Sequence, residues 1–201
     1  MGPKIDAPNI HEQRAMRQRQ LIDAATSIAI EGGTQSLTLA AVAKRAGLSR
    51  SSIYEYFSST ADLVSDLILE ELELYRTRLS TAVNGVDDPY EHIELWISEA
   101  LRYVVDGRHI LVKSLNSISI PEFRRAEIAQ GHRNLMATIT GPLTKIGIPD
   151  IHLGLSYLQN TIDAASIRID SGNEAAPEIL YAQSYAVAGL RALSQIIESE
   201  N

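Results

Sequence analysis

The sequence of 201 residues predicts an all-α protein of about nine helices. Apolar residues recur at spacings of three and four from Leu21 to Ile197, as on the buried face of a helix. No stretch shows the sustained alternation of apolar and polar residues that a half-buried strand would have. Turn-forming pairs such as Asn84-Gly85 and Ser171-Gly172 lie between the periodic segments and divide them into separate helices.

The ends of the first helices are marked by capping residues. Asn9 and Glu12 have the spacing of a capping box, and Gly32-Gly33 can end the first helix through a left-handed residue. Thr38 is a good N-cap for a short second helix, and Gly47 breaks the chain after that helix. A serine, Ser49 or Ser51, can cap a third helix that ends near Phe57.

The later helices follow from the same kind of signal. Asp88-Pro89 opens the fifth helix, Pro121 opens the seventh, and Gly141-Pro142 either kinks or ends the seventh. The nine expected helices are residues 9–31, 39–46, about 50–57, 59 or 60 to about 83, 89–106, 109 to about 117, a seventh from 121, and residues from about 150 to 170 and from about 173 to 198.

The formal charge of −7 is unevenly distributed. Residues 1–59 contain seven basic and five acidic side chains, a net charge of +2, and the remaining residues carry −9. A weakly basic head on an acidic body suits DNA held at one end. The sequence has no cysteine and no apolar run long enough to span a membrane, and its start lacks the apolar stretch of a signal peptide. We therefore expect a cytoplasmic protein without disulfides, and no motif predicts a cofactor or a metal.

The short helices around Gly47 have the pattern of a helix-turn-helix. Glycine at this position allows the left-handed backbone that a tight turn between two crossing helices requires. Val42 and Ile53 fall on the inward faces, and Ala43 is small where the helices cross. Short polar or planar side chains remain on the outward face of the third helix, namely Arg50, Ser51, Ser52, Tyr54 and Glu55. Such groups can reach phosphates and base edges.

Residues 37–49, residues 51–57 and Leu63 together resemble the signature of the tetracycline-repressor (TetR) family. The marks are Thr38 at the start of the second helix, alanines before a glycine, a serine that starts the recognition helix, and an aromatic-x-aromatic-Phe exit. The resemblance implies a helix-turn-helix domain at residues 1–59 and a helical effector-binding and dimerisation domain at residues 60–201. It also implies a ligand-responsive regulator, most often a repressor, that binds a pseudo-palindromic operator in double-stranded DNA as a homodimer and is released by a small-molecule effector.

The resemblance also implies the DNA contacts. Phosphate contacts carry over to Thr38, Ser49, Ser51 and Tyr54, and contacts at or near base edges carry over to Arg50, Ser52 and Tyr56. Thr60 stands where the family usually has a lysine, so one charge-assisted phosphate contact is lost, although its hydroxyl and the helix N-terminus can still receive an anion. Tyr56 either packs in the core or contacts DNA. The basic side chains Arg14, Arg17 and Arg19 either enter a minor groove or form a solvated helix face.

The last two helices have apolar residues at alternating spacings of four and three, as in a helix-helix seam. In the family this is where two copies pair, and the expected interface residues are Ile151, Leu155, Leu158, Ile162, Ile179, Ala186, Leu190 and Leu193. The alternative is an intramolecular core. The expected effector pocket combines aromatic and polar residues of the fifth and eighth helices, namely His92, Trp96, Tyr103, Tyr157, Asn160 and Asp163. Trp96 as plain core is the alternative there.

Two other functional classes compete with a regulator. An enzyme would need a catalytic constellation, but the sequence has no metal-spaced histidine pair, no Gly-x-Ser-x-Gly elbow and no phosphate-binding glycine loop. We therefore expect no enzymatic activity. A helical protein-interaction module without DNA binding is the second alternative, and it would fail to retard DNA in a gel at low salt.

Overall fold

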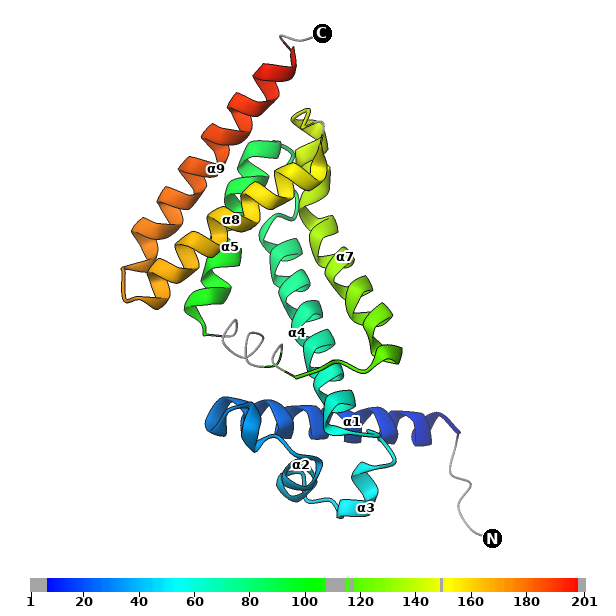
Figure 1. Cartoon of the computed structure of the whole chain (residues 1–201). Helices are drawn as coiled ribbons and strands as arrows, with labels where there is room; N and C mark the ends of the chain where they lie inside the picture. Colours follow the sequence, from blue (N-terminus) through cyan, green and yellow to red (C-terminus); the bar gives the residue numbers. More distant parts are fainter. Residues whose placement is uncertain (1–6, 108–114, 116–117, 149, 199–201) are drawn as a thin grey trace. The chain divides into compact units, whose positions relative to one another are not determined.

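The structure is a computed structural model that describes residues 7–107, 115, 118–148 and 150–198. Within these residues it contains eight α-helices and one short 3₁₀ helix, and the described chain forms no strand. This confirms the all-α prediction (Figure 1). The helix expected at residues 109–117 lies outside the described residues except for Leu115. No helix among the described residues is long and apolar enough to cross a membrane.

The helices form two compact units. The first contains the chain up to Glu71 together with described residues between 111 and 128, and the second contains the rest. Two helices, α4 (Thr60–Ala82) and α7 (Glu122–Lys145), begin in the first unit and end in the second. The expected domain boundary after residue 59 stays a prediction, because compact packing does not establish which part folds independently.

The first unit is built from α1 (Ala7–Gly32), the 3₁₀ helix η1 (Thr34–Ser36), α2 (Leu39–Arg45), α3 (Arg50–Ile53) and the start of α4. Its core side chains are almost completely shielded from water, and they include Leu21, Ala25, Val42, Ile53, Phe57 and Leu63. Each large side chain buried in this way contributes roughly 1.5–3 kcal/mol to folding. This core fixes how α2 and α3 are presented.

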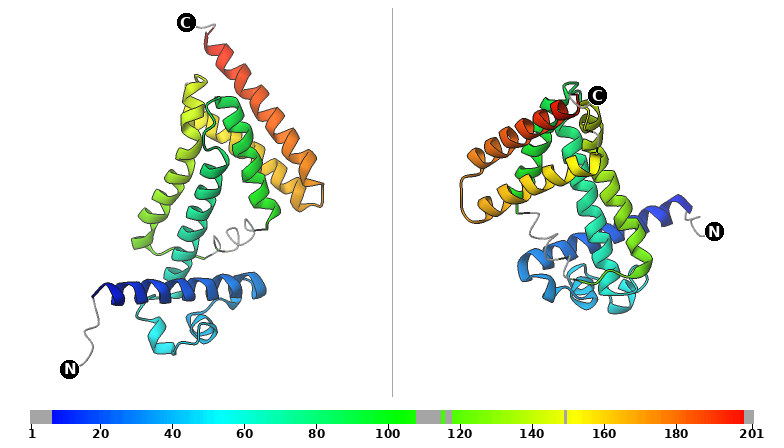
Figure 2. Two further views of the ribbon diagram at one scale, coloured as in Figure 1. Left: turned by 180° about the vertical axis from the view of Figure 1, so that it is seen from behind. Right: turned by 45° about the horizontal axis from the view of Figure 1, so that its top comes forward.

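The second unit contains the rest of α4 and α7 with α5 (Pro89–Val105), α8 (Ile151–Asp170) and α9 (Ala175–Glu198). Helices α8 and α9 lie side by side and are joined by a short turn (Figures 1 and 2). Helix α5 packs against both of them. Its fully buried side chains are Ile93, Ile97 and Leu101, one helical turn apart, which is the spacing that the sequence pattern predicted.

One helix end differs from expectation, and at Gly141-Pro142 the structure excludes one of two alternatives. The α-helical part of α3 ends at Ile53 rather than near Phe57. The next residues continue in a tighter turn, in which Tyr54, Glu55 and Tyr56 donate to carbonyls three residues earlier. Helix α7 does not end at Gly141-Pro142 but continues to Lys145.

Pro142 is tolerated inside α7 because another donor replaces the one that it lacks. Proline has no N–H to donate to the carbonyl of Thr138 four residues earlier. His92 of α5 supplies the missing bond, since its Nε2 lies 3.0 Å from this carbonyl oxygen. A carbonyl only accepts, so Nε2 carries the proton. The carbonyl that Pro142 leaves free therefore becomes a hydrogen-bonded contact between α7 and α5.

Asp88 is the N-cap of α5, and a substitution can test how much this cap stabilises the fold. Its Oδ1 accepts hydrogen bonds from the backbone N–H groups of Tyr90 and Glu91 at 2.9 and 2.8 Å. We expect Asp88→Ala to lower the free energy of unfolding by about 1 kcal/mol. Asp87→Ala is the matched control and should change it by less than about 0.5 kcal/mol. Urea unfolding of both variants measures the difference, and equal effects would exclude the capping role.

Candidate nucleic-acid interface

Thr38 and Gly47 define the first helix of the candidate interface and the turn that follows it. Thr38 is extended and its Oγ1 accepts a hydrogen bond from Ala41 N at 3.1 Å, which starts α2. Gly47 has a φ of 68°, and a Cβ placed there would meet nothing within 4 Å. The requirement for glycine is therefore conformational rather than steric. The left-handed residue redirects the chain from α2 to α3, as the sequence predicted.

Ser49 organises the start of α3. Its Oγ accepts from Ser52 N at 3.1 Å and lies 2.8 Å from the hydroxyls of both Ser51 and Ser52. These three hydroxyls form one small polar cluster at the helix N-terminus. Hydroxyls can donate to phosphate oxygens, and backbone N–H groups at a helix N-terminus favour an anion.

The structure brings the predicted contact residues together around α3. Thr38, Ser49, Arg50, Ser51 and Tyr54 are exposed, whereas Ser52, Tyr56 and Thr60 are half-buried. The side chain of Tyr54 points away from the core, with 53% of the residue exposed. Ile53 and Phe57, in contrast, are completely buried. The outward and inward faces therefore agree with the sequence pattern, while the DNA contacts themselves stay predictions.

Arg14 contacts the residues that follow α3. The sequence pattern did not predict this contact. Its Nη2 donates to the backbone carbonyl of Glu55 at 3.1 Å, and its guanidinium lies 5.5 Å from the ring centroid of Tyr56. A cation beside the carbonyl end of a helical turn and over an aromatic ring is favourable on both counts. Arg14 thus holds the exit of the recognition helix. The contact spans 41 residues, so no local pattern could reveal it.

Not every basic side chain of this unit is available to DNA. Arg45 at the end of α2 makes two hydrogen bonds of 2.7 Å to the carboxylate of Glu31 on α1. These bonds lower the pKa of Glu31 below its usual value. The pair fastens α2 to α1, and it neutralises one of the seven basic residues counted in the head. Arg50 and Lys44 are exposed.

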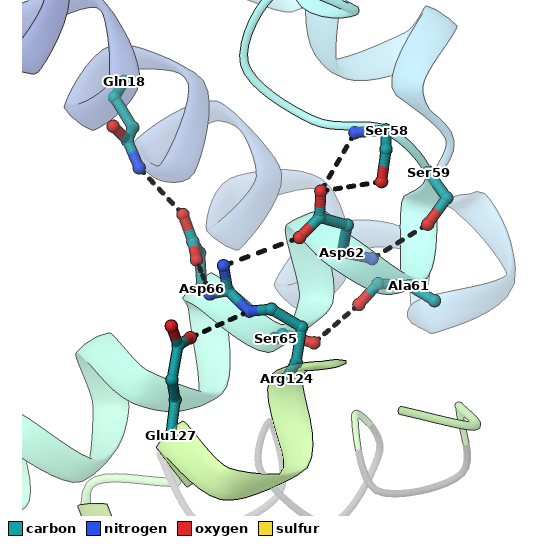
Figure 3. A network of polar contacts seen from close by, with 9 residues as sticks. All are labelled: Gln18, Ser58, Ser59, Ala61, Asp62, Ser65, Asp66, Arg124 and Glu127. Atoms are coloured by element: carbon teal, nitrogen blue, oxygen red, sulfur yellow. Dashed lines mark hydrogen bonds and ion pairs between the residues drawn. The ribbon is translucent and has the colours of Figure 1, made fainter. Parts of the chain in front are cut away.

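A cluster of charged residues lies behind the interface in the first unit (Figure 3). Arg124, in the first turn of α7, points between Asp62 and Asp66 of α4. Asp66 also accepts from Gln18 of α1 at 2.8 Å, and Asp62 accepts from Ser58 N and Oγ at 2.9 Å each. Ser59 caps α4, because its Oγ accepts from Asp62 N at 3.1 Å. The cluster joins α1, α4, α7 and the segment after α3.

The residues expected to form an effector pocket make different contacts within the second unit, and their role stays a prediction. Trp96 donates its indole N–H to Thr138 Oγ1 at 2.8 Å, beside the His92 contact. Tyr103 stacks on Tyr75 of α4 with ring centroids 4.3 Å apart, and burial raises the pKa of Tyr75. Asp163 is exposed and accepts from Gln159 at 2.9 Å.

The other two expected pocket residues, Tyr157 and Asn160, line a groove of about 690 Å³ between α8 and α9. Its walls are aliphatic and aromatic, with an ion pair between Arg168 and Glu178 at 2.7 Å. Several apolar side chains there are exposed, including Tyr157, Tyr181 and Tyr185, of which Tyr185 is 75% exposed. We call this surface the α8–α9 groove; its lining is Tyr157, Leu158, Asn160, Thr161, Ala164, Ala165, Arg168, Glu178, Tyr181, Ala182, Tyr185, Ala186, Gly189, Leu190 and Leu193.

The residues of the expected dimer seam are divided by the structure. Leu158, Ala186, Leu190 and Leu193 line the α8–α9 groove, whereas Ile151, Leu155, Ile162 and Ile179 do not. Leu158, Ile162, Ala186 and Leu190 are buried within the chain itself. The regular apolar stripe therefore serves largely to pack α8 and α9 against each other and α5. Tyr181 and Tyr185, which the stripe did not include, supply the exposed apolar surface.

Comparison with known proteins places the helix-turn-helix in a family. The family described as bacterial regulatory proteins, tetR family, matches residues 21–67. Over 91 residues the chain is 26% identical to the HTH-type transcriptional repressor KstR of Mycolicibacterium smegmatis, covering 45% of each chain. Over 162 residues it is 25% identical to the fatty acid metabolism regulator protein of Bacillus subtilis, covering 76% of this chain and 82% of that one. The chain thus spans less than half the length of the first of these relatives.

A solved structure of similar fold is the transcriptional regulator FadR from Bacillus subtilis in complex with stearoyl-CoA. The TM-score is 0.66 at 21% identity, over 87% of this chain and 98% of that chain. The matched residues 21–67 contain the caps, the glycine turn and the buried core described above. Residues 21–67 are therefore similar to the bacterial regulatory proteins of the tetR family, and the fold of the chain is similar to that of FadR.

Proposed function

We propose that this protein is a ligand-responsive transcriptional repressor that binds a pseudo-palindromic operator as a homodimer. The observation that carries the proposal is the exposed face of α3, where Arg50 and the hydroxyls of Ser49 and Ser51 lie on a helix fixed by a buried core. These groups are suited to guanine edges and phosphate oxygens. The family match at residues 21–67 supports the same reading.

Pairing through the α8–α9 groove supplies the two-fold symmetry in this proposal. The groove presents exposed tyrosines, Tyr157, Tyr181 and Tyr185, beside small residues such as Ala164 and Gly189 that let helices approach closely. Exposed apolar patches of this kind mark interaction surfaces. A second copy of α8 and α9 would complete a four-helix bundle. The two recognition helices then read two related half-sites.

The effector of the proposed repressor is a small molecule bound in the second unit. Long-chain acyl-CoA is the first class to test, because one relative is named a fatty acid metabolism regulator and one similar structure contains stearoyl-CoA. The experiment is an electrophoretic shift titration at low salt with the DNA upstream of the gene for this chain. Retardation that stearoyl-CoA reverses supports the complete proposal. Absence of any retardation favours a helical interaction module instead.

Arg50 is expected to read one base in each half-site. Arginine can donate two hydrogen bonds to O6 and N7 of guanine, and such a pair discriminates by about 1–3 kcal/mol. Selection of sites from a random duplex pool should yield one strongly preferred guanine per half-site with the wild type. Arg50→Ala should flatten the preference at that position alone.

Lys44→Ala is the matched control for Arg50, because Lys44 is also an exposed cation of the helix-turn-helix. It should leave every base preference unchanged. If Arg50 contacts only phosphate, its replacement weakens binding to all sequences alike and lowers the slope of log affinity against log salt by about one unit. That outcome would remove the base-reading role of Arg50 but not DNA binding itself.

A further inference from the structure

The first turn of α7 is fastened to the first unit by charges that are shielded from water. The side chain of Arg124 is 17% exposed, and those of Asp62 and Asp66 are 11% and 13% exposed. Nη1 of Arg124 lies 3.6 Å from Asp62 Oδ1, and Nη2 donates to Asp66 Oδ1. One guanidinium therefore bridges two successive turns of α4. Nε lies 3.1 Å from Oε2 of Glu127 on the same helix (Figure 3).

Each aspartate is held on its other side by a different element of the same unit. Asp66 Oδ2 accepts from Gln18 of α1, and Asp62 Oδ2 accepts from Ser58, which directly follows the exit of the recognition helix. A displacement of Arg124 therefore changes contacts that lead to α1 and to the end of α3. Leaving a member of such a buried polar network unpaired is costly, so its other members shift with it.

Thr138 lies fourteen residues after Arg124 on α7 and contacts α5 within the second unit. Its carbonyl accepts from His92, because Pro142 leaves that oxygen free, and its hydroxyl accepts from Trp96. Fourteen residues of α-helix are about four turns, roughly 21 Å. A continuous helix is a rigid element that can carry a displacement over such a distance. Among the described contacts, α7 thus has a polar attachment within each unit.

We infer that Arg124 is the positioning residue through which α7 couples the state of the second unit to the DNA-binding surface. When α7 shifts, Arg124 pulls on Asp62 and Asp66, and the change reaches α1 and the segment after the recognition helix. This inference rests on the proposed function, because it explains how an effector in the second unit would alter operator affinity. Arg124 touches neither DNA nor effector in this account.

Coupling between two sites is reciprocal, so DNA can be used in place of the effector to detect it. Trp96 is the only tryptophan of the chain, and it is hydrogen-bonded to α7 and almost completely buried. Its fluorescence therefore reports on the α5–α7 attachment from within the second unit. Operator binding at α3 should change the emission of Trp96 if a displacement passes along α7, and variants of Arg124 separate this route from α4, which also runs through both units.

The experiment titrates the full-length protein with an operator duplex selected from a random pool and records DNA binding and Trp96 emission together. The test variant is Arg124→Gln/Asp66→Asn, which removes the charge of the arginine and of one of its two aspartate partners while keeping groups that can hydrogen-bond. Asp62 keeps its charge and its bonds from Ser58. The matched control is Arg125→Gln/Glu122→Gln, which removes an exposed ion pair in the same turn of α7. Arg124→Lys is a second test variant, because a lysine retains the charge but cannot bridge two carboxylates as a fork.

We expect the wild type and the control to show the same change in emission on binding operator. The test variant should still bind operator but lose most of the emission change, because the displacement no longer reaches the α5–α7 attachment. The emission change of Arg124→Lys should lie between those of the wild type and the double variant. This single variant still tests the inference if the double variant does not fold. An undiminished emission change in both test variants, or no change in the wild type, would overturn the inference. If the wild type binds no duplex at all, the proposed function is overturned as well. The DNA-binding measurement, recorded beside the emission, distinguishes this outcome from a loss of coupling alone.

Discussion

Replacing both Tyr181 and Tyr185 by glutamate is expected to convert the protein into monomers and to weaken operator binding by roughly 100-fold or more. Both tyrosines are exposed and line the α8–α9 groove. In the proposed dimer the substitutions would place four carboxylates near the two-fold axis, where unpaired charges are costly to bury. A monomer engages only one half-site, so the gain from linking two half-sites is lost. Sedimentation and operator titration measure the two effects.

Leu180→Glu is the matched control for this experiment. Leu180 is on the same helix and is 59% exposed, but it lies outside the groove. The control should sediment as a dimer and bind operator as the wild type does. If the Tyr181 and Tyr185 double variant also remains dimeric with unchanged association, the two copies pair through another surface.

Arg124→Gln is expected to lower the free energy of unfolding by about 3 kcal/mol, since removing one partner of a buried ion pair typically costs 3–5 kcal/mol. The lower end applies because Asp62 and Asp66 keep hydrogen bonds from Ser58 and Gln18. The loss arises from two poorly solvated aspartates that no longer face a cation. For a chain of this size the melting temperature should fall by roughly 6–12 °C.

Arg125→Gln controls for the loss of an arginine at the start of α7. Arg125 is 62% exposed and pairs with the exposed Glu122. An exposed pair of this kind contributes less than about 1 kcal/mol, so the control should melt close to the wild type. Equal stability of the two variants in urea unfolding would mean that the cluster around Arg124 is solvated and adds little to folding.

The helix-turn-helix could be predicted because its determinants are local. The cap at Thr38, the left-handed Gly47 and the cap at Ser49 each act within three or four residues of themselves. The inward and outward faces of α3 follow from the same short range. The end of α3 could not be predicted as well, because the tighter turn after Ile53 has no separate residue signal.

The supporting contacts could not be predicted because they join distant parts of the chain. Arg14 meets Glu55 and Arg124 meets Asp66 across 41 and 58 residues, and any of many charges could have filled these positions. The path of α7 through Pro142 depends on a histidine from another helix, His92. The proline signal alone therefore could not decide between a kink and an end of the helix.

The dimer seam shows a different limit of sequence patterns. An apolar stripe at spacings of three and four indicates that a helix face is buried. It does not indicate whether that face packs against the same chain or against a second copy. Leu158 lies on the stripe and is 2% exposed within one chain, so a charge there would test folding rather than dimerisation. The effector site stays a prediction. Trp96 contacts Thr138, Tyr103 stacks on Tyr75, and Tyr157 lines the α8–α9 groove.

A hydroxyl-radical footprint on the selected operator tests the central claim most directly. The claim is that residues 39–53 of two chains bind DNA as a symmetric pair. Two recognition helices of a dimer contact half-sites about one helical turn apart, roughly 10 base pairs, or a multiple of that. We predict two protected patches related by a dyad at such a spacing, both lost in the Tyr181 and Tyr185 double variant at protein concentrations that saturate the wild type. A single patch without a dyad, or no protection, would contradict the account.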